Sequence, residues 1–549
     1  MKKICWHIGV ASVALMMSRA FATDSVRFDR FEYIGKDVAS EPRPASGTYR
    51  NPILPGYYPD PSVTRVGSKF YLVNSTFAHW PGIPIHESTD LVHWKLIGHA
   101  LNDPAKLDFD GLDISRGVFA PAIDYHQGTY YIINTLVDAG GNFFVTSKTP
   151  GGPYSDPVWL KEIDGIDPAF FFDDDGKAYV VNNGPPVGTP RYGGHRAIWM
   201  QEFDVKAQRL VGPRKIIVDG GADPSKNPIW IEGPHVYKID GTYYLMCAEG
   251  GTGFMHSEVV FRSKSPWGPW DPYAGNPILT QRDLAMNRPN GVTSTGHADL
   301  VQKKDGSWWA VFLGTRPYSN DLYNTGRETF LLPVTWKDGW PIILPQGLAV
   351  PRSVYSKNGR PNNRAWDTVA PPTIDRDEFN GKSTTEWLQV YVPKKKWYST
   401  GQGALWIEAQ DVRLDEKRNP SFLARRQQDL RFEASTELSY RLPGIAAGLA
   451  AYQNADHWYF LGSRAKGDQQ QVFLERRDGK EARVVAETLV ASTKSLQLRI
   501  RGDGQRYDFD YDSGSGWTAL RENDDASFLS TEKAGGFVGT VLGPYARQE

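Results

Sequence analysis

One pattern recurs five times between residues 49 and 350 of this chain. Each copy has a polar or small residue, followed directly by proline in three copies, then an apolar strand, a turn glycine and an aromatic strand. Hairpin units that repeat every roughly 50–65 residues are typical of a β-propeller, in which each unit is one blade. The pattern therefore predicts five blades around a central axis. The copies begin at Asp60, Ala120, Asp167, Glu232 and His297, and their turn glycines are Gly67, Gly128, Gly176, Gly241 and Gly306.

Three of the five copies begin with an acid, namely Asp60, Asp167 and Glu232. In a propeller the innermost strand of each blade starts at the axis, so we expect these three carboxylates to converge on one pocket. A single Asp before proline is commonly a turn residue, but three acids at the start of equivalent repeats are not explained by turns. Because like charges at close range are unfavourable, the arrangement indicates a chemical function.

Paired carboxyls are the groups that hydrolyse glycosidic bonds, one as a proton donor and one as a carboxylate across the sugar. The two stand roughly 6.5–9.5 Å apart in an inverting enzyme and roughly 5–5.5 Å apart in a retaining enzyme. Asp60 and Glu232 come from blades one and four, which favours the wider, inverting spacing. Asp167 adds a negative charge near Glu232, and such a charge raises the pKa of a neighbouring carboxyl and keeps a general acid protonated.

Composition and motifs exclude several other classes of protein. The chain has 62 Lys and Arg against 63 Asp and Glu, so it lacks the basic surface typical of nucleic-acid-binding proteins. It contains no H-E-x-x-H, G-x-S-x-G or P-loop motif. The glycine-rich run at 250–253 lies between two predicted strands and indicates a channel rim. Cys5 and Cys247 are the two cysteines, and since Cys5 lies in a predicted export signal, no intramolecular disulfide is expected.

The segments before and after the predicted propeller differ from it in composition. Residues 1–22 resemble a secretory signal peptide, with Lys2 and Lys3, an apolar stretch and a cleavage site at Ala20-Phe21-Ala22. We therefore expect export to the periplasm or the cell exterior, without a membrane anchor. Residues 23–48 are predicted to be an N-terminal arm, 49–350 the propeller, and the Pro- and Asn-rich 351–372 a linker.

The remaining residues, 373–549, show strict alternation of apolar and polar side chains. Leu496, Leu498 and Ile500, for example, alternate with Gln497, Arg499 and Arg501. Such strands bury one face and expose the other, which is typical of an antiparallel sandwich. The expected fold is therefore all-β: a five-bladed β-propeller followed by an antiparallel β-sandwich.

Seven motifs give the chain a family resemblance: NPILPGYYPDPS (51–62), STFAHWPGIPIHESTDLVHW (75–94), GIDPAFFFDDDGKAY (165–179), WIEGPHVYKIDGTYYL (230–245), STGHADLV (294–301), GRETFLLPV (326–334) and GGFVGTVLGPYA (535–546). With these motifs the chain resembles the family 43 glycoside hydrolases of the β-xylosidase and α-L-arabinofuranosidase type, many of which carry a C-terminal concanavalin-like β-sandwich. The resemblance implies an inverting mechanism in which Asp60 is the general base and Glu232 the general acid. It implies that Asp167 tunes the pKa of Glu232 and orients it.

The same resemblance implies a set of substrate-binding side chains. Arg327 matches an arginine that binds sugar hydroxyls in the innermost subsite, and Phe77 and Trp80 match an aromatic strip that lines it. Phe119 stands where many xylosidases of this type have Trp, which leaves the sugar preference open. Phe537 matches an aromatic residue that the C-terminal domain brings to the mouth of the pocket.

His297 matches a histidine that lies beside a channel calcium ion in some members of the family and binds no ion in others. We therefore expect no required cofactor, with Ca²⁺ near His297 as the one candidate metal.

The expected activity is exo-acting release of terminal β-1,4-linked xylose from xylo-oligosaccharides, in xylan degradation. An α-L-arabinofuranosidase that acts on the arabinose side chains of arabinoxylan, or an enzyme with both activities, is the nearest alternative. A sugar-binding propeller without catalysis is a more distant one, because a lectin has no use for a proton donor. The sandwich is expected either to bind polymer or to form a wall of the active site. The expected partner is an oligosaccharide, with no nucleic acid and no membrane.

Overall fold

The computed structural model describes residues 25–37, 47–355, 372–381 and 386–549. The predicted signal peptide and residues 356–371 of the predicted linker lie outside these ranges. The chain divides into two compact units. The propeller unit comprises the described parts of 42–368 together with 535–539, and the sandwich unit comprises the described parts of 1–41 and 369–534 together with 540–549.

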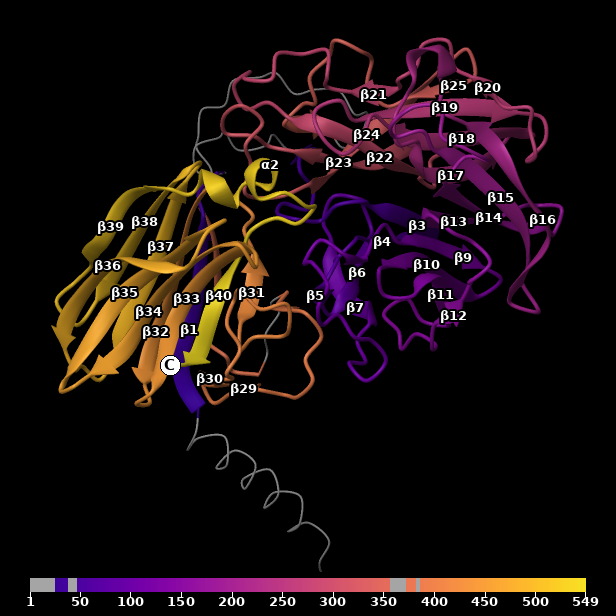
Figure 1. The fold of residues 1–549 in the computed structure, drawn as a ribbon. Coiled ribbons are helices and arrows are strands. Elements are labelled where there is room, and N and C mark those ends of the chain that lie inside the picture. Colours follow the sequence, from indigo (N-terminus) through magenta and orange to yellow (C-terminus); the bar gives the residue numbers. More distant parts are fainter. Residues whose placement is uncertain (1–24, 38–46, 356–371, 382–385) are drawn as a thin grey trace, which may run out of the picture. The chain divides into compact units, whose positions relative to one another are not determined.

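Five separate antiparallel sheets form the propeller unit, one for each predicted blade (Figure 1). Blade one contains β3 (Ser62–Val66), β4 (Lys69–Val73), β6 (Gly82–Ser88) and β7 (Lys95–Leu101). Blade two contains β8 (Gly117–Val118), β9 (Ala122–His126), β10 (Thr129–Val137), β11 (Gly141–Ser147) and β12 (Val158–Trp159). Blade three contains β13 (Ile166–Phe172), β14 (Ala178–Gly184), β15 (Ala197–Asp204) and β16 (Arg209–Asp219).

Blades four and five complete the unit. Blade four contains β17 (Glu232–Ile239), β18 (Thr242–Glu249), β19 (Ser257–Ser263), β20 (Asp271–Pro272) and β21 (Leu279–Thr280). Blade five contains β22 (Thr293–Gln302), β23 (Trp308–Thr315), β24 (Glu328–Lys337) and β25 (Trp340–Ile342). The short strands β2 (Thr48–Arg50) and β26 (Ser353–Tyr355) pair with each other and so join the two ends of the propeller sequence.

The hairpins form because their turn residues suit the backbone they must adopt. All five predicted turn glycines have φ between 63° and 88°, a region that residues with a Cβ rarely occupy. The second strand of each hairpin is buried over most of its length; β18, for instance, has seven consecutive buried residues after Thr242. Cys247 lies in this strand and is fully buried, as predicted.

The sandwich unit consists of two antiparallel sheets. One runs in the order β29-β30-β1-β32-β37-β38-β39, with β27 also paired to β1, and the other runs β36-β35-β34-β33-β40-β31-β28. The predicted alternation is confirmed in β37 (Leu496–Asp503), where Leu496, Leu498 and Ile500 are fully buried. The remaining strands are β27 (Thr373–Asp377), β28 (Leu388–Val390), β29 (Tyr398–Gly401), β30 (Ala404–Glu408), β31 (Leu423–Arg426), β32 (Arg431–Tyr440), β33 (Ile445–Asn454), β34 (His457–Lys466), β35 (Gln469–Asp478), β36 (Arg483–Ala491), β38 (Arg506–Asp512), β39 (Thr518–Asp525) and β40 (Val541–Gln548).

Strand β1 (Ser25–Gly35) corrects one boundary in the sequence analysis. These residues were predicted to belong to an N-terminal arm, but they form a strand of the sandwich that pairs on both sides, with β30 and with β32. Val26, Phe28 and Phe31 are buried in the sandwich core. The strand forms because its apolar side chains fill a gap between strands that lie about 400 residues later in the sequence.

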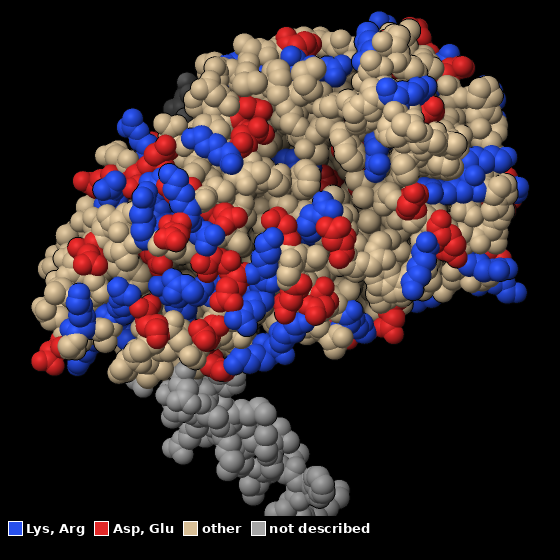
Figure 2. Space-filling model, viewed as in Figure 1, with Lys and Arg blue, Asp and Glu red and all other residues tan. Residues whose placement is uncertain are grey.

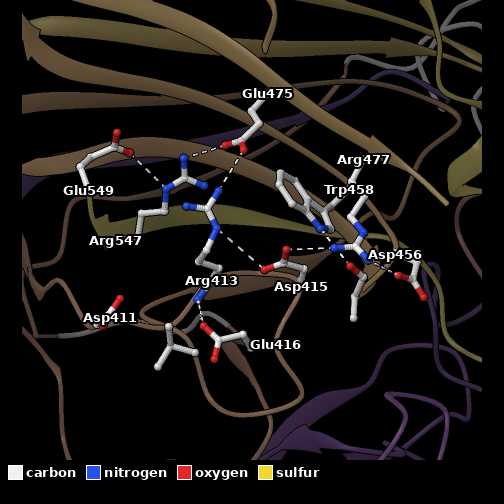
Figure 3. Close-up of polar contacts among 12 residues, drawn as sticks. Asp411, Arg413, Asp415, Glu416, Asp456, Trp458, Glu475, Arg477, Arg547 and Glu549 are labelled. Atoms are coloured by element: carbon white, nitrogen blue, oxygen red, sulfur yellow. Dashed lines mark hydrogen bonds and ion pairs between the residues drawn. The ribbon is translucent and has the colours of Figure 1, made fainter. Parts of the chain in front are cut away.

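A network of charges fixes the last strand of the sandwich (Figure 3). Glu475 on β35 is 6% exposed and pairs with Arg547 on β40 at 2.7 Å and with Arg413 at 3.0 Å. Arg477 pairs with Asp415 at 2.9 Å. Because a buried charge that loses its partner is strongly destabilising, this network holds β40 and the segment around Arg413 in a single arrangement.

Helices are short among the described residues: η2 (Pro224–Lys226), η3 (Ser527–Leu529) and α2 (Thr531–Ala534). None of the helices in this part of the chain has the length and apolar character needed to cross a membrane. On the face displayed in Figure 2, basic and acidic side chains are interspersed and no large area carries one sign of charge.

Candidate active site

A cavity of about 470 Å³ opens in the propeller unit, and all five blades contribute to its lining. The three predicted acids, Asp60, Asp167 and Glu232, all line it, together with His297 and Arg327. These residues are spread over more than 260 positions of the sequence, and the five blades bring them together around one space. The convergence expected from the repeats is therefore observed.

The backbone at the entry of the inner strands has an unusual conformation. Asp60, Asp167 and His297 have φ values of 52°, 54° and 52°, in the left-handed region that non-glycine residues seldom adopt. Gly233 has the same conformation in blade four, with φ of 56°. Because residues held in this region tend to mark functional sites, the repeated strain supports a role for this ring of positions.

Glu232 was predicted to occupy the same repeat position as Asp167. The strand register shows instead that Glu232 lies one residue earlier in its repeat. In blade three, Ile166 pairs with β14 and the register then shifts across the next two residues. In blade four, Glu232 pairs with β18 and the same shift follows. Glu232 is therefore equivalent to Ile166, which also lines the cavity, and Gly233 is equivalent to Asp167.

The offset has a steric reason. A Cβ at Gly233 would lie 2.8 Å from Nε2 of His297, so no side chain fits at this position of blade four. The preceding residue supplies the acid instead. The sequence pattern could not distinguish the two positions, because Glu232 and Gly233 both stand before the proline of the repeat.

Asp60 is held as a carboxylate. Nη1 of Arg327 donates to its Oδ1 at 2.9 Å, and the hydroxyl of Ser75 donates to its Oδ2 at 2.6 Å. Burial alone would raise the pKa of Asp60, but Arg327, His297 and the Ser75 hydroxyl together lower it below the usual value. Asp60 is thus an ionised group that can accept a proton.

Glu232 and Asp167 are shifted in the opposite direction. Burial, followed by the Asp60 charge, raises the pKa of Glu232 to about 7. Burial and the Glu232 charge raise the pKa of Asp167 well above its usual value. The backbone N–H of Gly233 donates to Oδ2 of Asp167 at 3.3 Å, which places the two acids beside each other. Since the coupling is mutual, an ionised Asp167 opposes ionisation of Glu232.

Two buried histidines border the acids. Burial lowers the pKa of His297 to about 4 and that of His256 to about 3, so both are neutral near pH 7. Nδ1 of His297 lies 3.8 Å from Oδ1 of Asp60. Within the described ranges, no three His, Cys, Asp or Glu side chains are grouped so that they could hold a metal ion.

Aromatic rings form one wall of the cavity. Phe77 lies 5.3 Å from Phe119 and 5.8 Å from Phe537 between ring centroids, and Arg327 packs against Phe77 and Phe537. The backbone N–H of Phe537 donates to Oγ of Ser115 at 2.8 Å, which anchors this late segment within the propeller unit.

Trp80 does not belong to this wall, contrary to the prediction. It lies in β5 (His79–Trp80), is 4% exposed, and is absent from the cavity lining. Its indole is packed into the protein interior, so the aromatic strip consists of Phe77, Phe119 and Phe537.

Several lining residues were missed by the sequence analysis. They come from loops and strand ends that lie outside the repeated pattern. The one available signal was that Trp230 opens the WIEGP motif containing Glu232. Gly251 and Thr252 belong to the run that was predicted to form a channel rim, and both line the cavity. The missed residues are Arg116, Val137, Ile166, Arg196 and Trp230.

The chain is similar to proteins of one family over both units. A family model described as "Glycosyl hydrolases family 43" matches residues 49–341, and one described as "Beta xylosidase C-terminal Concanavalin A-like domain" matches residues 376–549. A xylosidase/arabinosidase from Butyrivibrio fibrisolvens is 38% identical over 510 residues, which cover 90% of this chain and 95% of that protein.

Two further similarities also extend over most of the chain. A non-reducing end α-L-arabinofuranosidase, BoGH43B, from Bacteroides ovatus is 37% identical over 520 residues, covering 91% of this chain and 92% of that protein. The crystal structure of a GH43_12 protein retrieved from a capybara gut metagenome has a TM-score of 0.87 at 39% identity, covering 95% of this chain and 99% of that one.

Proposed function

The chain belongs to glycosyl hydrolases family 43, and from this premise we propose that it is an inverting exo-glycosidase that releases terminal β-1,4-linked xylose from xylo-oligosaccharides. One observation carries the proposal. Asp60, with a lowered pKa, and Glu232, with a pKa raised to about 7, line the same cavity. A carboxylate and a carboxylic acid in one cavity are the base and the acid that glycoside hydrolysis requires.

In this mechanism Glu232 donates its proton to the glycosidic oxygen as the bond to the anomeric carbon breaks. A water molecule attacks that carbon from the opposite face, and Asp60 accepts the proton that the water loses. The products are a leaving alcohol and a sugar with inverted configuration. Asp167 lies beside Glu232, and because neighbouring like charges oppose each other's ionisation, an ionised Asp167 would favour the protonated form of Glu232.

Arg327 has two tasks in this proposal. Its Nη1 holds Asp60 ionised, and its buried Nε has no hydrogen-bond partner among the described residues. That free N–H supports a contact with a sugar hydroxyl. The Phe77, Phe119 and Phe537 rings pack beside it and favour a pentose, because a hexose carries an additional hydroxymethyl group. A cavity of about 470 Å³ has room for the end of a chain, which supports exo action.

Arabinose release is the second candidate. The relatives from Butyrivibrio fibrisolvens and Bacteroides ovatus are named for arabinosidase activity. The test compares kcat/KM for 4-nitrophenyl β-D-xylopyranoside and 4-nitrophenyl α-L-arabinofuranoside. We expect the xyloside to be the better substrate. A much higher kcat/KM on the arabinoside would replace the xylosidase assignment, and no hydrolysis of either would reject the proposed function.

Export of the enzyme to the periplasm or the cell exterior is also part of the proposal, supported by the signal-like residues 1–22. Mass spectrometry of the protein recovered from cell fractions tests it. The expected result is a chain outside the cytoplasm that begins after Ala22. A chain retained in the cytoplasm with its first 22 residues would reject export.

A further inference from the structure

Trp230 lies at the cavity with an unusually exposed ring. The residue is 39% exposed, although the indole is among the largest apolar groups in a protein. It lines the same cavity as Glu232, which follows it by two positions in the sequence. A large ring left open to solvent beside buried acids is a surface on which a ligand can pack.

The backbone of this segment is held firmly in place. Trp230 has φ of 52°, a strained conformation for a bulky residue. Three hydrogen bonds maintain it: Trp230 N donates to Gly194 O at 2.8 Å, Gly250 N donates to Ile229 O at 2.9 Å, and Nδ2 of Asn183 donates to Ile231 O at 2.6 Å. The indole is therefore presented to the cavity by a fixed main chain.

Arg196 packs against the Trp230 ring and has hydrogen-bond donors that no described residue uses. Its guanidinium carbon lies 4.7 Å from the centroid of the Trp230 ring, and the side chain also lines the cavity. Within the part of the chain that the structure describes, the Arg196 side chain makes no hydrogen bond or ion pair, and its Nε is buried without a partner. Its N–H groups are available to a ligand.

A neighbouring pair shows what a purely structural arrangement looks like. Arg214 packs 4.5 Å from the ring of Trp199, but Arg214 forms an ion pair with Asp164 and Trp199 Nε1 donates to Pro185 O at 2.8 Å. Both members of that pair have protein partners. Among the described residues, the side chains of Arg196 and Trp230 pack against each other and form no hydrogen bond or ion pair with another side chain.

The chemistry of the proposed reaction suggests which part of the substrate Trp230 and Arg196 contact. The general acid protonates the oxygen of the breaking bond, so the departing sugar lies on the side of Glu232. We propose that Trp230 and Arg196 form the binding site for this leaving sugar, with the indole stacked on the C–H face of a pyranose ring and the guanidinium donating to its hydroxyls. The inference rests on the proposed function and adds a specificity site to it.

The test measures how strongly the enzyme prefers a sugar leaving group. Xylobiose fills both ring positions, whereas β-D-xylopyranosyl fluoride has a single ring and a fluoride leaving group. The ratio of kcat/KM for xylobiose to kcat/KM for the fluoride is expected to fall roughly tenfold or more in Trp230→Ala. Trp230→Phe keeps an aromatic face, so its preference for xylobiose over the fluoride is expected to stay close to that of the wild type. Trp336→Ala is the matched control, because Trp336 is 37% exposed and lies outside the cavity.

Arg196 adds a readout that a merely structural role would not change. The Arg196 charge lowers the pKa of Glu232, after the larger effect of Arg327. Arg196→Gln is therefore expected to lower the xylobiose preference and to move the alkaline limb of the pH profile to higher pH. A normal thermal midpoint confirms that each variant folds.

Binding gives a second measurement that does not depend on turnover. In a Glu232→Gln background, Trp230→Ala is expected to weaken xylobiose binding much more than xylose binding, as measured by calorimetry. An unchanged substrate ratio and unchanged xylobiose binding in Trp230→Ala, with the wild type active, would overturn this inference alone. A wild type that hydrolyses no pentoside would instead remove the proposed function on which it rests.

Discussion

Nη1 of Arg327 donates to Oδ1 of Asp60 at 2.9 Å, and the two side chains are only 5% and 7% exposed. This buried contact lowers the pKa of Asp60, which has to be ionised to act as a base. Arg327→Met is therefore expected to raise that pKa and to move the acidic limb of kcat/KM to higher pH. Activity at the optimum is expected to fall by about a hundredfold, because a preorganised charge is lost.

Arg262→Met is the control for this substitution. Arg262 packs 4.3 Å from the ring of Trp340 in the same unit and does not line the cavity. Arg262→Met removes a positive charge as Arg327→Met does, but it should leave the acidic and alkaline limbs of the pH profile in place. An acidic limb that does not move in Arg327→Met would contradict the role given to Asp60.

Asp167 lies beside Glu232, and burial together with the Glu232 charge raises the pKa of Asp167; the proposed mechanism uses the reciprocal effect of an ionised Asp167 on Glu232. A general acid works while protonated, so activity is lost as pH rises through the pKa of Glu232, about 7. Asp167→Asn removes the like charge, so the alkaline limb is expected to move to lower pH. Asp175→Asn changes the same charge in an exposed turn of blade three and should leave the limb unchanged. An alkaline limb at the same pH in Asp167→Asn and Asp175→Asn would exclude coupling between Asp167 and Glu232.

Removal of the proton donor has an effect that depends on the leaving group. Glu232→Ala is expected to reduce kcat on xylobiose by roughly 10²–10⁴-fold, while aryl xylosides with acidic phenols lose much less. The alkaline limb should also disappear from the profile on the activated substrate. Equal losses on good and poor leaving groups would show that Glu232 has another role.

Gly233 offers a test of the steric argument for the position of Glu232. In Gly233→Ala the new Cβ would lie 2.8 Å from Nε2 of His297, at φ of 56°. Gly241→Ala is a matched control in the same blade, since its φ is 73° but its Cβ would have no neighbour within 4 Å. Both should lose roughly 1–2 kcal/mol of stability from the backbone strain, and Gly233→Ala should lose more because of the contact with His297. Only Gly233→Ala should also lose most of its activity, and equal activity in the two would contradict the clash.

The blades and the acids could be predicted from the sequence for a physical reason. Each blade is a local hairpin that repeats its own turn glycine and aromatic strand, so the signal is present five times. Asp60 and Asp167 stand directly before a proline at the entry of such a strand, and both line the cavity as expected. Phe537 lines it too, but only the family resemblance indicated that residue.

The remaining features depend on contacts between distant residues. The alternation of Val26, Phe28, Phe31 and Tyr33 in β1 was present in the sequence, but a bulge interrupts it and its partners in β32 are about 400 residues away. Arg196 lies directly before β15, in the loop within blade three, and Trp230 lies shortly before β17, where the chain enters blade four; no repeat marks either residue. The one-residue offset of Glu232 follows from a steric contact with His297, which only the folded chain reveals.

The proposed mechanism requires Asp60 and Glu232 to act on opposite faces of one sugar. Proton NMR of the first-formed product, recorded before mutarotation while 4-nitrophenyl β-D-xylopyranoside is hydrolysed, tests this directly. Inversion at the anomeric carbon produces α-xylose first, and the β anomer is expected to form later by mutarotation. Initial formation of β-xylose would mean retention through a covalent intermediate and would contradict the roles assigned to both carboxyls.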